Sequence, residues 1–169
     1  MPIPIIKAEV VAFRGPTDKD RDAEALDLAT SLLCNKYHTG LLDSLTAAHK
    51  LYFAAAMRAS LNDAGGLGFG FVPKLPFGSR KKAGKMVWKQ INRLKQGDFS
   101  DITLNALKMD KSRELQKSLE SISNRANVMM NVFSQGRSWN EYLQQAETVK
   151  NLTKADIVEV ANRYFSGSY

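Results

Sequence analysis

The chain lacks the residues that would cross-link a fold or anchor it in a membrane. Only one of its 169 residues is a cysteine, Cys34, which excludes an internal disulfide framework. No apolar run approaches the ~20 residues of a membrane span, and Met1 to Ile6 is too short and proline-rich for a signal-peptide core. A chain of this length buries about 70% of its unfolded surface. We therefore expect one domain over residues 1–169, folded around a hydrophobic core, whose compartment the sequence leaves open.

Histidine is almost absent as well, which bears on metal chemistry. The only two, His38 and His49, lie eleven residues apart. The inverted zinc motif His-x-x-Glu-His needs two histidines four residues apart, with a glutamate that activates water. The sequence therefore predicts no metal ligands in this segment, and both histidines are interpreted as polar residues of loops or helix ends.

Cys34 and His38 are four residues apart, so they could touch on a helix. A Cys–His nucleophile also needs an orienting group and an oxyanion hole. The segment 37–40 has the character of a loop that follows the helix, which breaks this geometry. We interpret Cys34 as a small core residue at the end of an apolar helix face, and we predict no catalytic residue in the chain.

Positive charge is unevenly distributed. The net charge is +7, yet the chain outside residues 74–95 is close to neutral. Apolar residues in the same segment, such as Ala83, Val87 and Ile91, form a separate stripe, which indicates an amphipathic helix. We favour a solvated face over a polyanion site for its basic side. Residues 74–95 contain no acid and eight basic groups: Lys74, Arg80, Lys81, Lys82, Lys85, Lys89, Arg93 and Lys95.

The hydrophobic periodicity predicts a mixed fold. Helices should cover one face of a small, largely antiparallel sheet, which is an α+β arrangement. A turn at 62–66 should join two strands into a hairpin. Thr17 or Asp18 should cap the first helix. The expected strands are 5–13, 51–61 and 67–75, and the expected helices are 17–35, 41–49, 79–96, 100–133, one from Ser138, and 153–165.

The helix expected at 100–133 is unusually long and carries one apolar stripe. Its members step by four and three residues, which puts them on a single face. We expect Leu119, Ile122 and Phe133 to be buried against the sheet or neighbouring helices. The full stripe is Leu115, Leu119, Ile122, Ala126, Met129 and Phe133.

Residues Gly68 to Val72 match the centre of the RNP1 motif, whose aromatic residues stack on RNA bases. The basic first position of that motif is Leu67 here, and its last aromatic position is Lys74. An RNA-binding module that uses this strand and the basic helix 80–95 is therefore an alternative function. The preferred interpretation is a strand with Leu67, Phe69 and Phe71 on one buried face and glycines on the other.

The ordered set of elements resembles a non-catalytic domain of the pitrilysin/insulin-degrading-enzyme family of zinc metallopeptidases, which includes the mitochondrial processing peptidases. The resemblance covers Val10 to Phe165. Four segments carry it: the strand end and turn 13–18, the helix 25–33, the short helix 40–45, and the helix 152–158 that leads to Arg163-Tyr164-Phe165.

The resemblance also implies which domain this is. Catalytic domains of the family carry the inverted zinc motif, and the partner half contributes an arginine and a tyrosine after the short helix. By the spacing of Leu45 and Leu51, those positions are Thr46 and Phe53. Threonine has no guanidinium fork and phenylalanine no phenol. The resemblance thus implies the second domain of the catalytic half, without residues of the reaction centre.

We therefore expect a structural, substrate-enclosing domain of a zinc metalloendopeptidase that cleaves peptides. Zinc would belong to a catalytic domain of the same protein, and this segment alone would not be an enzyme. No substrate-binding residue, specific nucleic acid or membrane span is predicted. The family usually continues into another strand after the position of Gly167 to Tyr169, so we expect a fragment of a longer chain. An inactive structural subunit of a peptidase-like complex is the other alternative.

Overall fold

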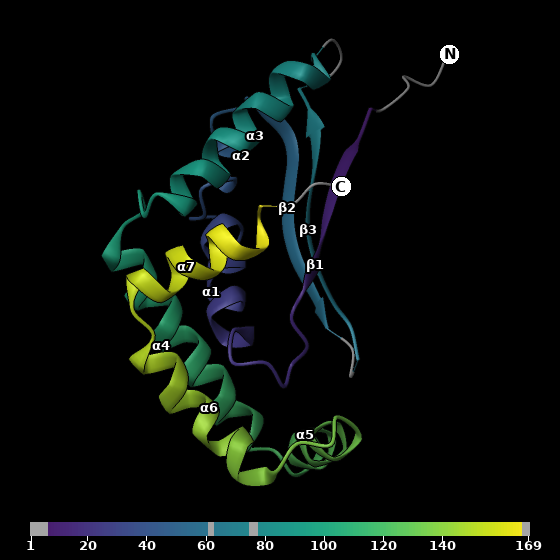
Figure 1. Cartoon of the computed structure of the whole chain (residues 1–169), viewed down its shortest axis with the longest axis vertical. Coiled ribbons are helices and arrows are strands. Elements are labelled where there is room, and N and C mark those ends of the chain that lie inside the picture. Colours follow the sequence, from purple (N-terminus) through teal and green to yellow (C-terminus); the bar gives the residue numbers. More distant parts are fainter. Residues whose placement is uncertain (1–6, 61–62, 75–77, 167–169) are drawn as a thin grey trace.

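A small antiparallel sheet lies against a layer of helices in this computed structural model (Figure 1). The structure describes residues 7–60, 63–74 and 78–166. Within them, three strands form the sheet in the order β1-β3-β2, so the last strand of the hairpin is central. This confirms the α+β class. The expected strand and turn positions at Ile5, Ile6, Leu61, Asn62, Leu75 and Pro76, and the chain end at 167–169, lie outside the described residues.

Most elements lie close to their predicted positions. The strands are β1 (Glu9–Gly15), β2 (Leu51–Ser60) and β3 (Gly65–Pro73). The helices are α1 (Ala23–Leu33), α2 (Asp43–Ala47), α3 (Arg80–Lys95), α4 (Asp101–Ser118), α5 (Ile122–Ser134), α6 (Trp139–Asn151) and α7 (Lys154–Tyr164).

The core forms where the inward face of β3 meets the helices. Leu67, Phe69 and Phe71 alternate along the strand and are all buried, as the sequence predicted. The ring of Phe69 lies 5.9 Å from that of Phe13 and 5.5 Å from that of Trp88. This aromatic cluster joins β1, β3 and α3, and Phe165, which follows α7, adds an edge contact to Phe13 at 5.8 Å.

The first helix begins later than predicted. Thr17 and Asp18 do not cap it, because α1 starts at Ala23. The carboxylate of Asp20 instead accepts hydrogen bonds from the backbone N–H of Thr17 at 2.7 Å and from its hydroxyl at 3.0 Å. These local bonds stabilise a turn, which competes with helix formation in this segment.

The long helix predicted at 100–133 is wrong, because the chain forms two helices there. The break falls at residues 119–121, and α5 then runs in a different direction from α4 (Figure 1). The hydroxyl of Ser118 donates to the carbonyl of Leu115 at 2.6 Å and shares a hydrogen bond with Tyr142 of α6. Ser121 caps α5 by accepting from the N–H of Asn124. Serines that bond to nearby backbone disfavour the helix interior.

The break also overturns the predicted burial of the stripe. Ile122 is 79% exposed and Phe133 86% exposed, and Leu119 is half-buried. Val132 is the buried residue of α5, so this helix packs through a different side from the one predicted. The stripe residues Ile122, Met129 and Phe133 are all exposed, so in the described part of the chain nothing covers that face of α5.

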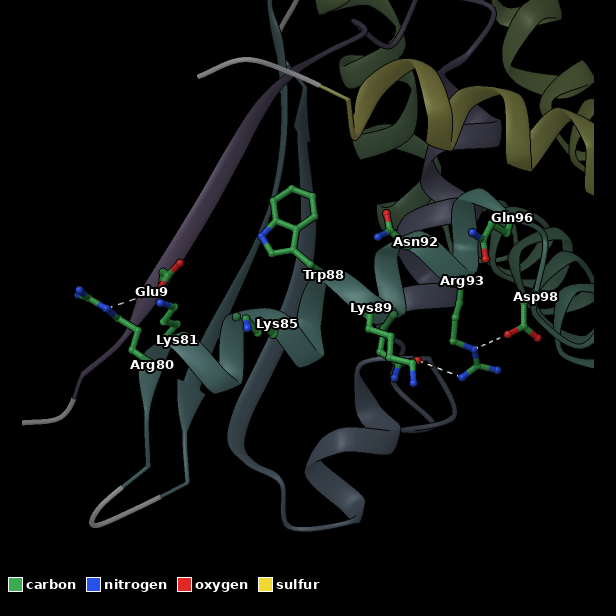
Figure 2. Close-up of a pocket in the computed structure, with 12 residues that line it drawn as sticks. Glu9, Arg80, Lys81, Lys85, Trp88, Lys89, Asn92, Arg93, Gln96 and Asp98 are labelled. Atoms are coloured by element: carbon green, nitrogen blue, oxygen red, sulfur yellow. Dashed lines mark hydrogen bonds and ion pairs between the residues drawn. The ribbon is translucent and has the colours of Figure 1, made fainter.

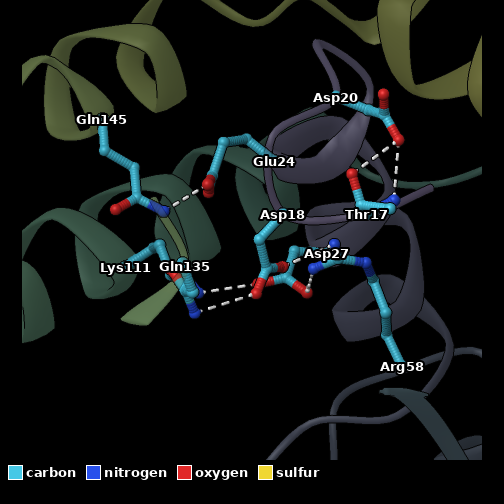
Figure 3. Close-up of polar contacts among 9 residues, drawn as sticks. All are labelled: Thr17, Asp18, Asp20, Glu24, Asp27, Arg58, Lys111, Gln135 and Gln145. Carbon is cyan, nitrogen blue, oxygen red and sulfur yellow. Dashed lines mark hydrogen bonds and ion pairs between the residues drawn. The ribbon is translucent and has the colours of Figure 1, made fainter. Parts of the chain in front are cut away.

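A partly buried network of charges ties the helices to β2 (Figure 3). Arg58 projects from β2 toward the helices, with its side chain only 9% exposed, and contacts Asp18 at 2.7 Å and Asp27 at 3.2 Å. Asp27 also pairs with Lys111 of α4 at 2.7 Å. Nearby, Glu24 accepts a hydrogen bond from Gln145 of α6, and burial raises the pKa of Glu24.

Candidate substrate-facing surface

The helices cover one face of the sheet, and among the described residues nothing covers the other, so that face is open (Figure 1). The side chains on this open face come from all three strands. Val10 and Met57 are exposed large apolar residues on its two edge strands, and Phe53 is about half exposed. The register places Val10 opposite Gly70 and Met57 opposite Gly68. The result is a surface with exposed apolar side chains at its edges and glycines between them, and Arg14, opposite Gly66, is also exposed on it.

The glycines keep the centre of this open face flat. At Gly68 an added Cβ would lie 2.7 Å from the carbonyl oxygen of Val11, so the close approach of β1 requires glycine there. At Gly66 and Gly70 the nearest atoms are 3.8 Å and 3.6 Å away, which is ordinary contact. Packing therefore does not demand glycine at these two positions, and a flat backbone surface remains accessible.

Thr46 and Phe53 mark the positions at which the resemblance places an arginine and a tyrosine in the partner half. Phe53 lies on the open face, next to an irregularity in the pairing of β2 with β3. Thr46 lies near the end of α2, where its hydroxyl donates to the carbonyl of Asp43 at 2.8 Å. Neither side chain supplies a cation or a phenol to this surface.

Cys34 does not form a nucleophile pair with His38. The helix α1 ends at Leu33, and His38 lies in the following loop with a positive φ of 57° and a side chain that is 84% exposed. Cys34 packs against the core, as predicted. Its burial, together with the nearby Asp43 carboxylate, raises the pKa of the thiol to about 12. His49 also has a positive φ, after α2, and is exposed.

This environment predicts a slowly reacting thiol. With a pKa of about 12, roughly one Cys34 side chain in 10,000 is a thiolate at pH 8. We expect alkylation of the native protein by iodoacetamide at pH 8 to be at least about 100-fold slower than alkylation of the same protein in guanidinium chloride. Equal rates in the two conditions, followed by mass spectrometry, would contradict the buried environment.

The described residues offer neither a metal site nor a membrane-spanning helix. They contain no cluster of three or more His, Cys, Asp or Glu side chains that could hold a metal ion. Among the helices of residues 7–60, 63–74 and 78–166, none combines the length and apolar character that crossing a bilayer requires.

The RNP1-like aromatics Phe69 and Phe71 are buried, so neither offers a ring face for base stacking.

A second surface feature was only partly visible in the sequence. A groove of about 970 Å³ runs along α3 beside β1, and it is lined by basic side chains and Trp88 (Figure 2). The charge of this helix was evident from residues 74–95. The groove was not, because it depends on how α3 lies against the strand.

Comparison with solved structures places this fold among the peptidases. A protease from Helicobacter pylori matches with a TM-score of 0.84 and 22% identity, over 94% of this chain and 38% of that one. The inactive peptidase domain of a Bordetella parapertussis protein described as a zinc protease matches with a TM-score of 0.79 and 19% identity, over 95% and 88%. The M16 peptidase inactive domain from Pseudomonas fluorescens matches with a TM-score of 0.73 and 16% identity, over 93% of this chain and 37% of that one.

The fold is therefore that of the inactive domains of M16, or pitrilysin-like, peptidases. The chain spans less than two-fifths of the length of the Helicobacter pylori protease. No protein-family profile matches the sequence. No curated protein sequence matches it either.

Proposed function

We propose that this chain is a structural, substrate-enclosing domain of a zinc metalloendopeptidase whose metal and catalytic residues lie in another domain. The observation that carries the proposal is the match to an inactive peptidase domain over nearly the full length of both chains. The absence of His-x-x-Glu-His from the sequence agrees with this assignment. Zinc in the catalytic domain would polarise the scissile carbonyl and activate water.

The open face of the sheet is the surface that we assign to the substrate. It exposes apolar side chains at its two edge strands, and the glycines between them let an extended peptide lie close to the backbone. The opposite face is occupied by the helices (Figure 1). A peptide held here would gain apolar contacts, while the chemistry would be performed by residues outside this chain.

A second candidate function is that of an inactive structural subunit. A chain of complex III2 from Candida albicans matches with a TM-score of 0.71 and 14% identity, over 93% of this chain and 40% of that one. A domain of this fold can therefore occur in an assembly that is not described as a protease. The two candidates differ in whether a zinc-bearing peptidase accompanies the domain.

The test is to tag the chain at its own gene, purify it, and identify by mass spectrometry what it is continuous with or bound to. We expect a polypeptide with the inverted zinc motif. A photo-crosslinker at Met57, on the open face, should then capture a peptide substrate, whereas one at Lys117, an exposed residue of α4, should not. Finding no zinc peptidase would favour the structural subunit, and equal capture at both positions would contradict the assigned face.

For the chain alone we expect no peptidase activity and no stoichiometric zinc. The physical reason is the missing ligand set, because zinc sites use three or four nitrogen, sulfur or oxygen ligands in tetrahedral geometry. Elemental analysis and a peptide-cleavage assay with and without chelator measure both properties. One zinc per chain together with chelator-sensitive cleavage would show that this domain carries its own centre.

A further inference from the structure

The exposed side of α3 carries three lysines whose charge no acidic side chain in the described part of the chain neutralises. Lys81, Lys85 and Lys89 form a row at every fourth residue and lie beside the groove (Figure 2). In residues 7–60, 63–74 and 78–166, none of these three makes an ion pair or a side-chain hydrogen bond. The two arginines at the ends of the groove are different, since Arg80 lies 3.7 Å from Glu9 and Arg93 bonds Asp98 at 2.6 Å.

This arrangement opposes the stability of the helix that carries it. Like charges four residues apart on a helix repel each other. The first turn of α3 is also basic and contains no acid, which is unfavourable next to the positive end of the helix dipole. Unfavourable local interactions that the rest of the fold does not offset are expected at surfaces that bind a ligand or a partner.

Among the remaining groups of the groove, Trp88 and the side-chain amides add hydrogen-bond donors, whereas Glu9 and Asp98 are acceptors. Trp88 forms a wall, and its ring makes perpendicular contacts with Phe13 and Phe69 at 6.2 Å and 5.5 Å. Its indole N–H makes no hydrogen bond within the described part of the chain, and Asn92 adds an amide at the same groove. Three ammonium groups, an indole and an amide together fit a ligand that is rich in acceptor oxygens.

We propose that this groove binds an acidic polypeptide segment in an extended conformation, with acidic residues at alternate positions. The spacing supports this ligand. Lysines four residues apart on a helix rise by about 6 Å. Alternate side chains of an extended strand are about 6.7 Å apart and point to the same side. A segment of the form Glu-x-Glu-x-Glu can therefore pair one carboxylate with each of Lys81, Lys85 and Lys89.

Two observations favour a polypeptide over a nucleic acid. Glu9 and Asp98 pair with the arginines near the two ends of the groove, so the uncompensated charge is confined to the three lysines between them. This matches a short acidic run between neutral residues better than a continuous phosphate backbone. Trp88 is half-buried and held by edge contacts with two phenylalanines, so it is poorly placed to stack on bases. This proposal does not depend on the peptidase function.

The experiment measures binding of a fluorescein-labelled peptide, Gly-Glu-Ala-Glu-Ala-Glu-Gly, to the whole chain by anisotropy at about 0.15 M salt. The matched neutral peptide carries glutamine in place of each glutamate. A single-stranded oligonucleotide of equal charge and anionic lipid vesicles are the competing ligands. We expect the acidic peptide to bind and the glutamine peptide to bind at least about tenfold more weakly, since three charge pairs are lost.

Variants assign the binding to the groove. Lys85→Gln with Lys89→Gln should raise the Kd of the acidic peptide about fivefold or more. Lys50→Gln with Lys117→Gln removes the same charge from exposed positions outside the groove and should change it less than about twofold. Emission of Trp88, measured in a Trp139→Phe background, should change on binding. The proposal is overturned if the peptide does not bind, if both variant pairs weaken it equally, or if the oligonucleotide or the vesicles bind more tightly through these lysines.

Discussion

Replacing Phe69 by alanine is expected to lower the free energy of unfolding by about 3–5 kcal/mol. Phe69 is 1% exposed, and its ring packs against those of Phe13 and Trp88, so truncation leaves a cavity where β1, β3 and α3 meet. Denaturant unfolding followed by far-UV circular dichroism measures the change. The matched control is Phe133→Ala, which removes the same side chain from a position that is 86% exposed and should cost less than about 0.5 kcal/mol.

The pair also tests two interpretations of the sequence. If Phe69→Ala cost as little as Phe133→Ala, Phe69 would not be a core residue, and a role in base stacking would regain support. If instead Phe133→Ala cost several kcal/mol, the exposed side of α5 would be covered in solution, for example by another copy of the chain. Repeating the control over a range of protein concentrations would separate self-association from intramolecular packing.

The second large effect is expected at Arg58. Its replacement by alanine leaves Asp18 and Asp27 without the guanidinium that bridges them in a partly buried site, and we expect a loss of about 3 kcal/mol. In this variant Lys111 still pairs with Asp27 and Gln135 still donates to Asp18. The loss in free energy of unfolding should therefore lie at the lower limit of the range for buried ion pairs that lose one partner. The measurement is again denaturant unfolding at pH 7.

The control for Arg58 is Arg163→Ala. Arg163 also bridges two carboxylates, Asp22 and Glu159, but its side chain is about half exposed, so the cost should stay below about 1 kcal/mol. Adding Asp18→Asn to the Arg58 variant should recover part of the stability, because the carboxylate left without a cation is then neutral, while Asp27 keeps its pair with Lys111. Equal losses at Arg58 and Arg163, or no recovery, would show that the network is solvated rather than partly buried.

The sequence by itself determined the features that depend on neighbouring residues. Ser138, where the sequence predicts that a helix begins, forms a capping box with Glu141 through hydrogen bonds of 3.2 Å and 2.8 Å. Thr153, at the predicted start of the last helix, does the same with Asp156. The alternation of large residues and glycines in β3 correctly assigned one side of the strand to the core. Hydrogen bonds between residues three apart and the two-residue period of a strand are local, so a single sequence specifies them.

Only the tertiary structure decided which faces are covered. Periodicity showed that Ile122, Met129 and Phe133 share one side of a helix. Whether that side is buried depends on a neighbouring element, and after the break at 119–121 no element packs on this side of α5 in the described part of the chain. The four serines at 112, 118, 121 and 123 were the available signal for that break. The open face of the sheet and the groove along α3 are likewise products of packing, since each arises where one element leaves part of another uncovered.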